Sequence, residues 1–271
     1  MNLFTCPICK ERFEKSGNSL VCPNKHCFDL SKRGYVNLLR PSKSGAVRHG
    51  DDKLMVESRK SFLNAGFYAP LANAITEILR EKAPEHATVL DAGCGEGYYT
   101  VETKKALQTD LVYGVDVSRD AVHAASLRDK SLRLAVASIF DLPVPMESID
   151  VLLNLFAPYD SAEFSRVLKE GGLLVRAFPA ERHLWELKCA VYDTPYENEI
   201  DSFLLDGFEM IEKKSISFPL NLTTQTDIDA LFKMTPYYYK TSREGQARLA
   251  ALQSLQAHAE FYLAVYQKST K

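Results

Sequence analysis

Short apolar runs alternate with amphipathic segments through the middle of the chain, from Thr88 to Phe178. Apolar runs of this length are typical of buried strands, and apolar residues three and four positions apart are typical of helices. We expect strands over residues 88–91, 111–115, 133–137, 149–156 and 173–178, helices over 97–107, 118–127 and 161–168, and a Lys-Glu-Gly-Gly turn over 169–172. Repeated strand–helix units with short loops indicate an α/β fold with a parallel, doubly wound sheet.

The two ends of the chain follow other patterns. Residues 208–218 and 259–266 alternate between apolar and polar side chains, which predicts a last pair of antiparallel strands at a sheet edge. Upstream of the strand–helix units, residues 52–65 and 71–82 have helical spacing, and Pro84 ends the second of these helices.

A polar segment over residues 40–52, with Pro41, two glycines and several cations, predicts a linker or a mobile loop. Residues 28–39 precede it, alternate loosely, and are expected to close a small N-terminal module as a short strand. We therefore expect three parts, namely the module over residues 1–39, a linker and helical segment over 40–85, and an α/β domain over 86–271.

The segment from Leu90 to Thr100 predicts a strand, a tight turn and the start of a helix. It holds Asp91 at the strand end and then Gly93, Gly95 and Gly97, where a Cβ would keep a ligand from lying against the backbone. Ligands of open α/β sheets bind at the carboxyl ends of the strands. The sequence therefore predicts a cofactor site at this turn.

Three further residues at strand ends narrow the class of cofactor. Asp116 ends the second strand and could accept both ribose hydroxyls, although a simple strand-end cap is the alternative. Ser138 and Ile139 follow the third strand, where an adenine ring would be held. Asp91 would repel a pyrophosphate but suits the ammonium group of a methionine moiety, which favours S-adenosyl-L-methionine over a dinucleotide. This pattern is typical of class I methyltransferases, which have a Rossmann-like, mostly parallel sheet of seven strands; a dehydrogenase or a non-catalytic relative is the alternative.

Four cysteines and one histidine lie close together near the N-terminus. Cys6 and Cys9 form a Cys-x-x-Cys knuckle, and Cys22 is followed by His26 and Cys27. This spacing suits tetrahedral Zn²⁺, and a metal would stabilise a segment too small to bury a core of its own. Disulfides or a redox Cys-x-x-Cys pair are alternatives, and either His26 or Cys27 could be the fourth ligand.

Composition and charge bound the location and the partners. The chain is 46% apolar and 25% charged, with no apolar run long enough to span a bilayer and no signal peptide, so we expect a cytoplasmic protein without a membrane partner. Residues 1–60 hold 12 Lys and Arg against 6 Asp and Glu, whereas the remaining residues hold 21 against 29. A basic segment on an acidic protein predicts local contact with a polyanion, or else a solvated basic surface.

Seven sequence motifs occur together and span nearly the whole chain. They are Cys6-x-x-Cys9 with Cys22-x-x-x-His26, the segments 28–38, 59–71, 90–100 and 182–188, Ala157-Pro158, and Met234-Thr235-Pro236. Their combination resembles the RlmA-type methyltransferases that modify guanine N1 in large-subunit rRNA.

The resemblance implies specific ligands and a specific substrate. It implies zinc on Cys6, Cys9, Cys22 and His26, and contacts to S-adenosyl-L-methionine from Tyr68, Glu96, Gly97 and His183. It also implies methylation of a guanine N1 in a hairpin loop of 23S rRNA, with the zinc module and the linker holding the RNA. Two branches of the family methylate different neighbouring guanines, and both remain open for this chain.

Other functions and structural roles remain open alternatives at this stage. The chain could methylate another RNA or a small molecule, or could be a non-catalytic, zinc-dependent RNA-binding protein. A homodimer is compatible with the sequence. No catalytic residue can be identified, although Asp141 and Glu163 lie in loops that could face the cleft and remove the N1 proton. Tyr68 and His183 could instead have packing or hydrogen-bonding roles.

Overall fold

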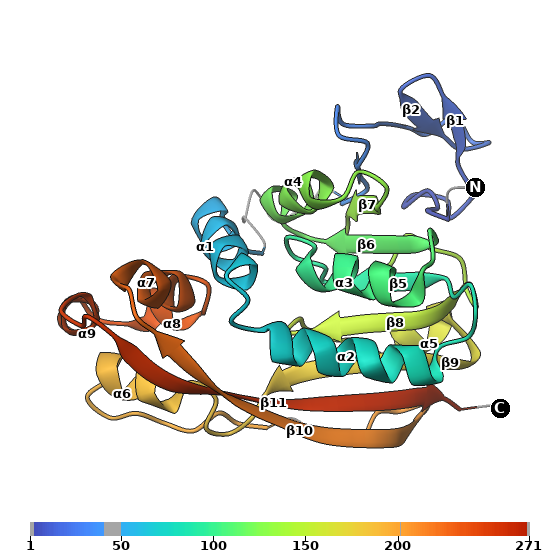
Figure 1. Cartoon of the computed structure of the whole chain (residues 1–271). Helices are drawn as coiled ribbons and strands as arrows, with labels where there is room; N and C mark the ends of the chain where they lie inside the picture. Colours follow the sequence, from blue (N-terminus) through green and yellow to red (C-terminus); the bar gives the residue numbers. More distant parts are fainter. Residues whose placement is uncertain (1–2, 41–49, 201, 270–271) are drawn as a thin grey trace.

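An eight-stranded sheet forms the body of the computed structural model, which describes residues 3–40, 50–200 and 202–269 (Figure 1). The strand order is β10 (Phe208–Leu222), β11 (Leu255–Lys268), β9 (Leu168–Pro179), β8 (Ile149–Leu155), β5 (Val89–Ala92), β6 (Val112–Asp116), β7 (Arg133–Val136) and β4 (Val36–Asn37). The pairs from β9 to β4 are parallel, and β11 is antiparallel to both β9 and β10. All four residues of β5 are buried, as expected for a central parallel strand covered on both faces.

Helices cover both faces of this sheet. They are α1 (Lys53–Asn64), α2 (Ala69–Lys82), α3 (Tyr98–Leu107), α4 (Arg119–Arg128), α5 (Ser161–Val167), α6 (Trp185–Val191), α7 (Gln225–Lys233), α8 (Tyr237–Lys240) and α9 (Arg243–Ala250). Ile75, Ile78 and Leu79 of α2 pack into one core layer with Val101 of α3, whereas Phe164 of α5 packs into the other layer. In the described ranges, no helix is long and apolar enough to cross a bilayer.

The seven strands predicted from the sequence are β5 to β11, and their mostly parallel arrangement is confirmed. The structure adds an eighth strand, β4, which comes from the N-terminal module. Its Val36 pairs with Ala135 of β7, and the Leu38 amide donates to the Val136 carbonyl at 2.9 Å. The prediction of one short strand over residues 28–39 was therefore confirmed only in part, because β3 ends at Asp29 and residues 36 and 37 form β4, in which Val36 also bridges Leu30 of the module. Residues 36 and 37 cover the otherwise open edge of β7.

The predicted turn over residues 169–172 was also wrong, because the structure includes these residues in β9. Leu168 pairs with Ile149, and the next pair along the ladder joins Leu173 to Val151. Residues 169–172 therefore bulge out of register, and Gly171 has a φ of +68°.

The N-terminal module is a small sheet of β1 (Glu14–Ser16), β2 (Ser19–Val21) and β3 (Cys27–Asp29), packed beside the β7 edge (Figure 1). The ring of Phe4 contacts Tyr113 of β6 edge-on, with centroids 5.5 Å apart. The Thr5 amide donates to the Pro143 carbonyl at 2.8 Å. The apolar core of the module is therefore continuous with that of the large sheet.

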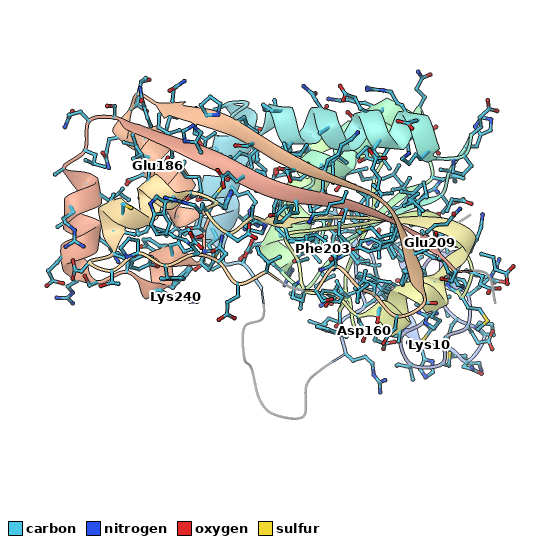
Figure 2. The ribbon with its side chains drawn as sticks, turned by 90° about the horizontal axis from the view of Figure 1, so that it is seen from below. Lys10, Asp160, Glu186, Phe203, Glu209 and Lys240 are labelled. Carbon is cyan, nitrogen blue, oxygen red and sulfur yellow. The ribbon has the colours of Figure 1, made fainter. Side chains whose placement is uncertain are left out.

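The long antiparallel ribbon of β10 and β11 links two distant parts of the molecule. Seen from below, Glu186 and Lys240 lie among helices at one end, whereas Lys10 and Glu209 lie toward the other end (Figure 2). Residues 41–49 of the predicted linker lie outside the described residues, and the division into parts at residues 39/40 and 85/86 stays a prediction. Residues 50–52 are described and lie at the start of α1.

Candidate active site and metal centre

A cavity of about 870 Å³ opens at the carboxyl ends of β5, β6, β7 and β8. Its volume is in the range that binds a ligand the size of a nucleoside derivative. The predicted site residues that line it are Asp91, Gly93, Gly95, Glu96, Asp116, Ser138 and Ile139. Further residues that line it are Asn37, Leu39, Arg40, Gly50, Asp51, Arg59, Leu63, Cys94, Tyr98, Tyr99, Val117, Phe140, Leu155, Phe156, Ala157 and Pro158.

The three glycines of the loop serve different purposes. A Cβ on Gly93 would lie 2.5 Å from the Ala157 Cβ, and a Cβ on Gly97 would lie 2.9 Å from the Ala125 Cβ. Both glycines also have positive φ, +94° and +86°. These two positions therefore need glycine for close packing of neighbouring elements and for their backbone conformation. Only Gly95 leaves open space, and its backbone could lie against a ligand.

Asp116 holds the glycine loop to the end of β6. One carboxylate oxygen accepts from the Gly95 amide at 3.0 Å, and the other accepts from the Ser118 amide at 2.7 Å. Burial raises the pKa of Asp116 above its ordinary value, with the two backbone donors opposing the shift. Each oxygen keeps a further lone pair, so this capping role is compatible with a bond to a ribose hydroxyl.

Asp91 is the most deeply buried acidic residue of the cavity, with 1% of its surface exposed. Its Oδ2 accepts from the Thr100 hydroxyl at 2.6 Å, whereas its Oδ1 has no partner among the described residues. Burial raises the pKa of Asp91 to about 7, and the nearby Asp116 adds to the shift. An ammonium group in the cavity would satisfy this oxygen, so the structure fits the methionine end of the expected cofactor.

Glu96 lines the same cavity but is held by a cation. Arg128 of α4 forms a salt bridge with it, and the Arg128 Nε donates to Oε2 at 2.8 Å. Oε1 has no partner among the described residues, although Glu96 is only 2% exposed. Glu96 therefore joins the glycine loop to α4 and keeps one oxygen for a ligand.

Tyr68 and His183 do not line the cavity. They contact each other, with the Tyr68 hydroxyl 3.4 Å from His183 Nε2, inside an aromatic cluster that includes Phe261. His183 Nδ1 accepts from the Glu260 amide at 3.1 Å, so the ring proton sits on Nε2. Burial lowers the pKa of His183 to about 3. The pair has the packing and hydrogen-bonding role left open as an alternative, and its contact with the cofactor stays a prediction.

Asp51, Phe140 and Phe156 line the cavity but were not among the predicted site residues. Phe140 and Phe156 are 58% and 43% exposed; Phe156 directly follows β8, and Phe140 lies in the loop after β7. Phe156 also has a φ of +58°, an unusual conformation for a bulky residue and one that clusters at functional sites. For Phe156, the available signal was a large apolar side chain directly after a buried strand.

Asn154 supports the loop that carries Phe156. Its side-chain amide donates to the carbonyls of Ala92 and Pro158, at 3.3 and 2.8 Å, and its oxygen accepts from Arg176 at 3.3 Å. These bonds use the side chain of Asn154 within the protein, so it holds the loop in place.

The two carboxyl groups predicted to face the cleft do not line the cavity. Asp141 forms a salt bridge with Lys10 of the N-terminal module. Glu163 pairs with Arg166 and accepts from the Leu142 amide at 2.5 Å. Both groups therefore stabilise the loop after β7 and its contact with the module.

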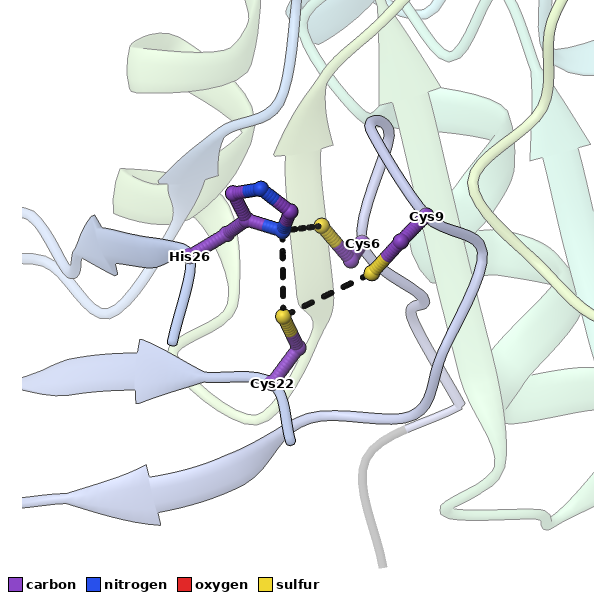
Figure 3. A group of neighbouring side chains, drawn as sticks. All are labelled: Cys6, Cys9, Cys22 and His26. Atoms are coloured by element: carbon purple, nitrogen blue, oxygen red, sulfur yellow. Dashed lines mark hydrogen bonds between the residues drawn. The ribbon is translucent and has the colours of Figure 1, made fainter. Parts of the chain in front are cut away.

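Four side chains of the N-terminal module converge on one point (Figure 3). The ligand atoms of Cys6, Cys9, Cys22 and His26 all lie within 4.8 Å of one another. Two sulfurs, of Cys9 and Cys22, are 3.5 Å apart, and His26 Nδ1 lies 3.3 and 3.6 Å from the sulfurs of Cys22 and Cys6. Tetrahedral zinc with ordinary bond lengths would place its ligand atoms about 3.6–3.8 Å apart, so these residues fit a zinc ion.

Cys27 does not belong to this cluster. It is exposed at the start of β3, whereas His26 turns inward just before the strand. Where the sequence left two candidates for the fourth ligand, the structure brings His26 to the other three side chains.

Comparison with known proteins identifies the family. The family profile described as "RlmA, N-terminal" matches residues 4–43, and a methyltransferase-domain profile matches residues 89–172. The chain is 35% identical to the 23S rRNA (guanine(748)-N(1))-methyltransferase of Streptomyces fradiae, over 83% of this chain and 81% of that protein. It is 32% identical to YxjB of Bacillus subtilis, provisionally named a 23S rRNA (guanine-N(1)-)-methyltransferase, over 93% of both chains. The chain therefore belongs to the family of 23S rRNA (guanine-N1)-methyltransferases.

Proposed function

We propose that this protein transfers a methyl group from S-adenosyl-L-methionine to N1 of a guanine in 23S rRNA. The observation that carries the proposal is the pairing of two features in one fold. A cavity in which a buried Asp91 oxygen has no partner among the described residues fits the donor, and a four-ligand zinc module stands beside β7 at the edge of the sheet. Family membership supports the same reaction.

In this proposal, three parts of the donor are held by different residues of the cavity. Asp91 holds the ammonium group, Asp116 the ribose hydroxyls, and the backbone after β7, at Ser138 and Ile139, the adenine ring. When bound, the donor supplies a methyl group on an electrophilic sulfonium centre. The protein then has mainly to align the acceptor nitrogen with that methyl group and to keep water away.

The acceptor must reach the cavity as an unstacked base. Guanine N1 carries a proton at neutral pH, and this proton must leave because the lone pair is otherwise not available. Phe156 and Phe140 offer exposed ring faces at the cavity, on which a base taken out of a hairpin loop could stack. Phe156 directly follows β8, and its ring packs against Tyr99 and Phe261.

The zinc module would hold the RNA near this opening. Its ligands fit zinc, and its fold is tied to the large sheet through β4 and through the salt bridge between Lys10 and Asp141. The excess of cations in residues 1–60 favours a polyanionic partner. A module fixed in this way could set the distance between the held RNA and the donor.

Transfer of tritium from labelled S-adenosyl-L-methionine to RNA tests the proposal. The acceptor is 23S rRNA from a strain that lacks this enzyme, and rRNA from a strain that has it is the matched control. We expect label in the first RNA and little in the second. Donor binding without transfer to 23S rRNA would favour a methyltransferase with another substrate or a non-catalytic RNA-binding protein.

The homodimer also stays a prediction. Light scattering coupled to size exclusion would report twice the chain mass of 30.4 kDa for a dimer. A mass equal to that of one chain at micromolar concentration would contradict it.

A further inference from the structure

One ion pair in the donor cavity has no role in the site as described above. Arg59 of α1 pairs with Asp51, which lies just before the same helix, and both side chains line the cavity. They are 28% and 25% exposed, so both face a partly enclosed space. Partly exposed ion pairs contribute little to stability. Stability therefore does not explain why this pair lies in the cavity, and we look for a role in ligand binding.

Three observations define where the Arg59 side chain lies. Its Nη1 lies 3.7 Å from the place that a Cβ on Gly95 would occupy, so the guanidinium group stands over the open glycine of the loop. Its Nη2 donates to the Met234 carbonyl at 3.3 Å. Its partner Asp51 is anchored in turn, because the Asp51 carbonyl accepts from the Ser118 hydroxyl at 2.6 Å.

The charges that line the cavity show what is missing from the donor site. The acidic side chains are those of Asp51, Asp91, Glu96 and Asp116, and the basic ones are those of Arg40 and Arg59. Arg40 is exposed, whereas the Arg59 guanidinium group stands over Gly95. The methionine end of the donor carries a carboxylate beside its ammonium group, and Asp91 suits only the ammonium group.

We propose that Arg59 binds the carboxylate of the donor's methionine moiety, and that Asp51 occupies Arg59 until the donor enters. The inference rests on the proposed donor and adds a binding residue to it. The planar guanidinium group donates two parallel hydrogen bonds to a carboxylate, so the donor carboxylate can replace that of Asp51. Asp91 and Arg59 together then recognise the two charges of an α-amino acid.

A pair of ligands that differ only in the carboxylate tests the inference by calorimetry. S-adenosyl-L-methionine carries the group, and decarboxylated S-adenosylmethionine lacks it. The wild-type protein is expected to prefer the former by about tenfold or more, a difference typical of one charge-assisted contact. In Arg59→Met this preference should fall to about twofold, while decarboxylated donor still binds.

Three further variants separate contact from other effects. Lys60→Met removes a charge from the next position of the helix, which does not line the cavity, and should keep the wild-type preference. Arg59→Lys keeps the positive charge but loses the two parallel hydrogen-bond donors, so it should keep only part of the wild-type preference. Asp51→Asn frees Arg59, so the preference should stay or rise.

The double variant Asp51→Asn with Arg59→Met excludes repulsion by an unpaired Asp51 as the cause. Loss of the preference in this variant as well supports the inference, and its return to the wild-type value overturns it. The inference is also overturned if Arg59→Met lowers the affinity for both ligands equally, or if the wild-type protein binds both ligands with equal affinity. If the wild-type protein binds neither ligand, the proposed donor itself is refuted. This result differs from a loss of preference, in which both ligands still bind.

Discussion

Asp91 combines deep burial with an oxygen that lacks a partner in the part of the chain described by the structure. Because burial raises its pKa to about 7, the residue is only partly ionised at neutral pH. A bound ammonium group would favour the ionised form and lower this pKa. Donor binding and protonation of Asp91 are therefore coupled.

This coupling predicts that donor affinity falls as pH drops. Below a pH of about 7 the free carboxyl becomes protonated, and binding must then release a proton. The dissociation constant for S-adenosyl-L-methionine should rise by roughly tenfold for each pH unit below that value. Calorimetry at pH 8, 7 and 6 measures it. Asp91→Asn should bind weakly at all three values, with a flat profile, and a flat wild-type profile would contradict the coupling.

His183 predicts an effect of pH on stability. Its pKa is lowered to about 3 in the folded protein, below the ordinary value of 6.5, so the unfolded chain binds more protons between these values. Its contribution is present above pH 6.5 and is lost as pH falls toward 3. His183→Gln should therefore reduce the loss of thermal stability between pH 7 and pH 5. If the melting temperatures of the variant and the wild type fall by the same amount between pH 7 and pH 5, this role of His183 is contradicted.

Several individual residues could be predicted from sequence, and others could not. Spacing alone placed the ligands Cys6, Cys9 and Cys22, because a knuckle is a local structure. Spacing left His26 and Cys27 open, and the family resemblance implied His26, which the structure brings to the other three ligands. Asp51, which pairs with Arg59 over the glycine loop, carried no local signal because its position depends on how α1 packs against α7 and α4.

At the scale of elements, the glycine loop depends on the contact between α3 and α4. Gly97 has a φ of +86°, and a Cβ there would lie 3.1 Å from the Cα of Ala125. Gly66, between α1 and α2, has a similar φ of +82°, but a Cβ there would meet nothing within 4 Å. A substitution at Gly66 therefore introduces backbone strain alone, whereas one at Gly97 introduces both backbone strain and steric overlap with α4.

We expect Gly66→Ala to lower the free energy of unfolding by about 1–2 kcal/mol, the cost of a left-handed conformation. Gly97→Ala should cost about 1–3 kcal/mol more, because the helices must also move apart. Urea denaturation measures both. Equal losses in the two variants would show that the packing of α3 against α4 is not the constraint.

Strands with a run of buried apolar residues could be predicted from the sequence. A strand that forms only by pairing with a segment far away in the chain could not. The runs that became β5, β8 and β11 stand out because one or both faces are buried. β4 has two residues and gains its place only by pairing with β7, about a hundred positions later. Helices α6 to α9 were not predicted, because they are short and lie between long strands.

For the whole molecule, the module and the sheet behave as one folded body. Phe4, Phe13 and Leu20 share a core with Tyr113 and Leu90 of the central strands. The zinc ligands hold the strands of the module together, so metal binding contributes to a core that extends into the donor domain. This continuity was not visible in the sequence, where a polar linker suggested separate parts.

Removal of zinc should therefore destabilise more than the module. We expect one zinc per chain, and chelation should lower the melting temperature by several degrees. Cys22→Ser should lose the metal, whereas Cys27→Ser, outside the cluster, should keep it. Elemental analysis with thermal melts measures both. An unchanged melting temperature after complete removal of zinc would show that the module folds without metal.

In the proposed function, the donor cavity and the zinc module together methylate one guanine N1 of 23S rRNA. The most direct measurement treats rRNA from a strain lacking this enzyme with protein and donor, and then combines nucleoside mass spectrometry with primer extension. We expect 1-methylguanosine and one new stop of reverse transcriptase in a hairpin loop, since a methyl group on N1 blocks base pairing. Its position decides between guanine 748, named for the Streptomyces relative, and a neighbour. Methylation at N2 or on another base, or no methylation while the donor is bound, would contradict the proposal.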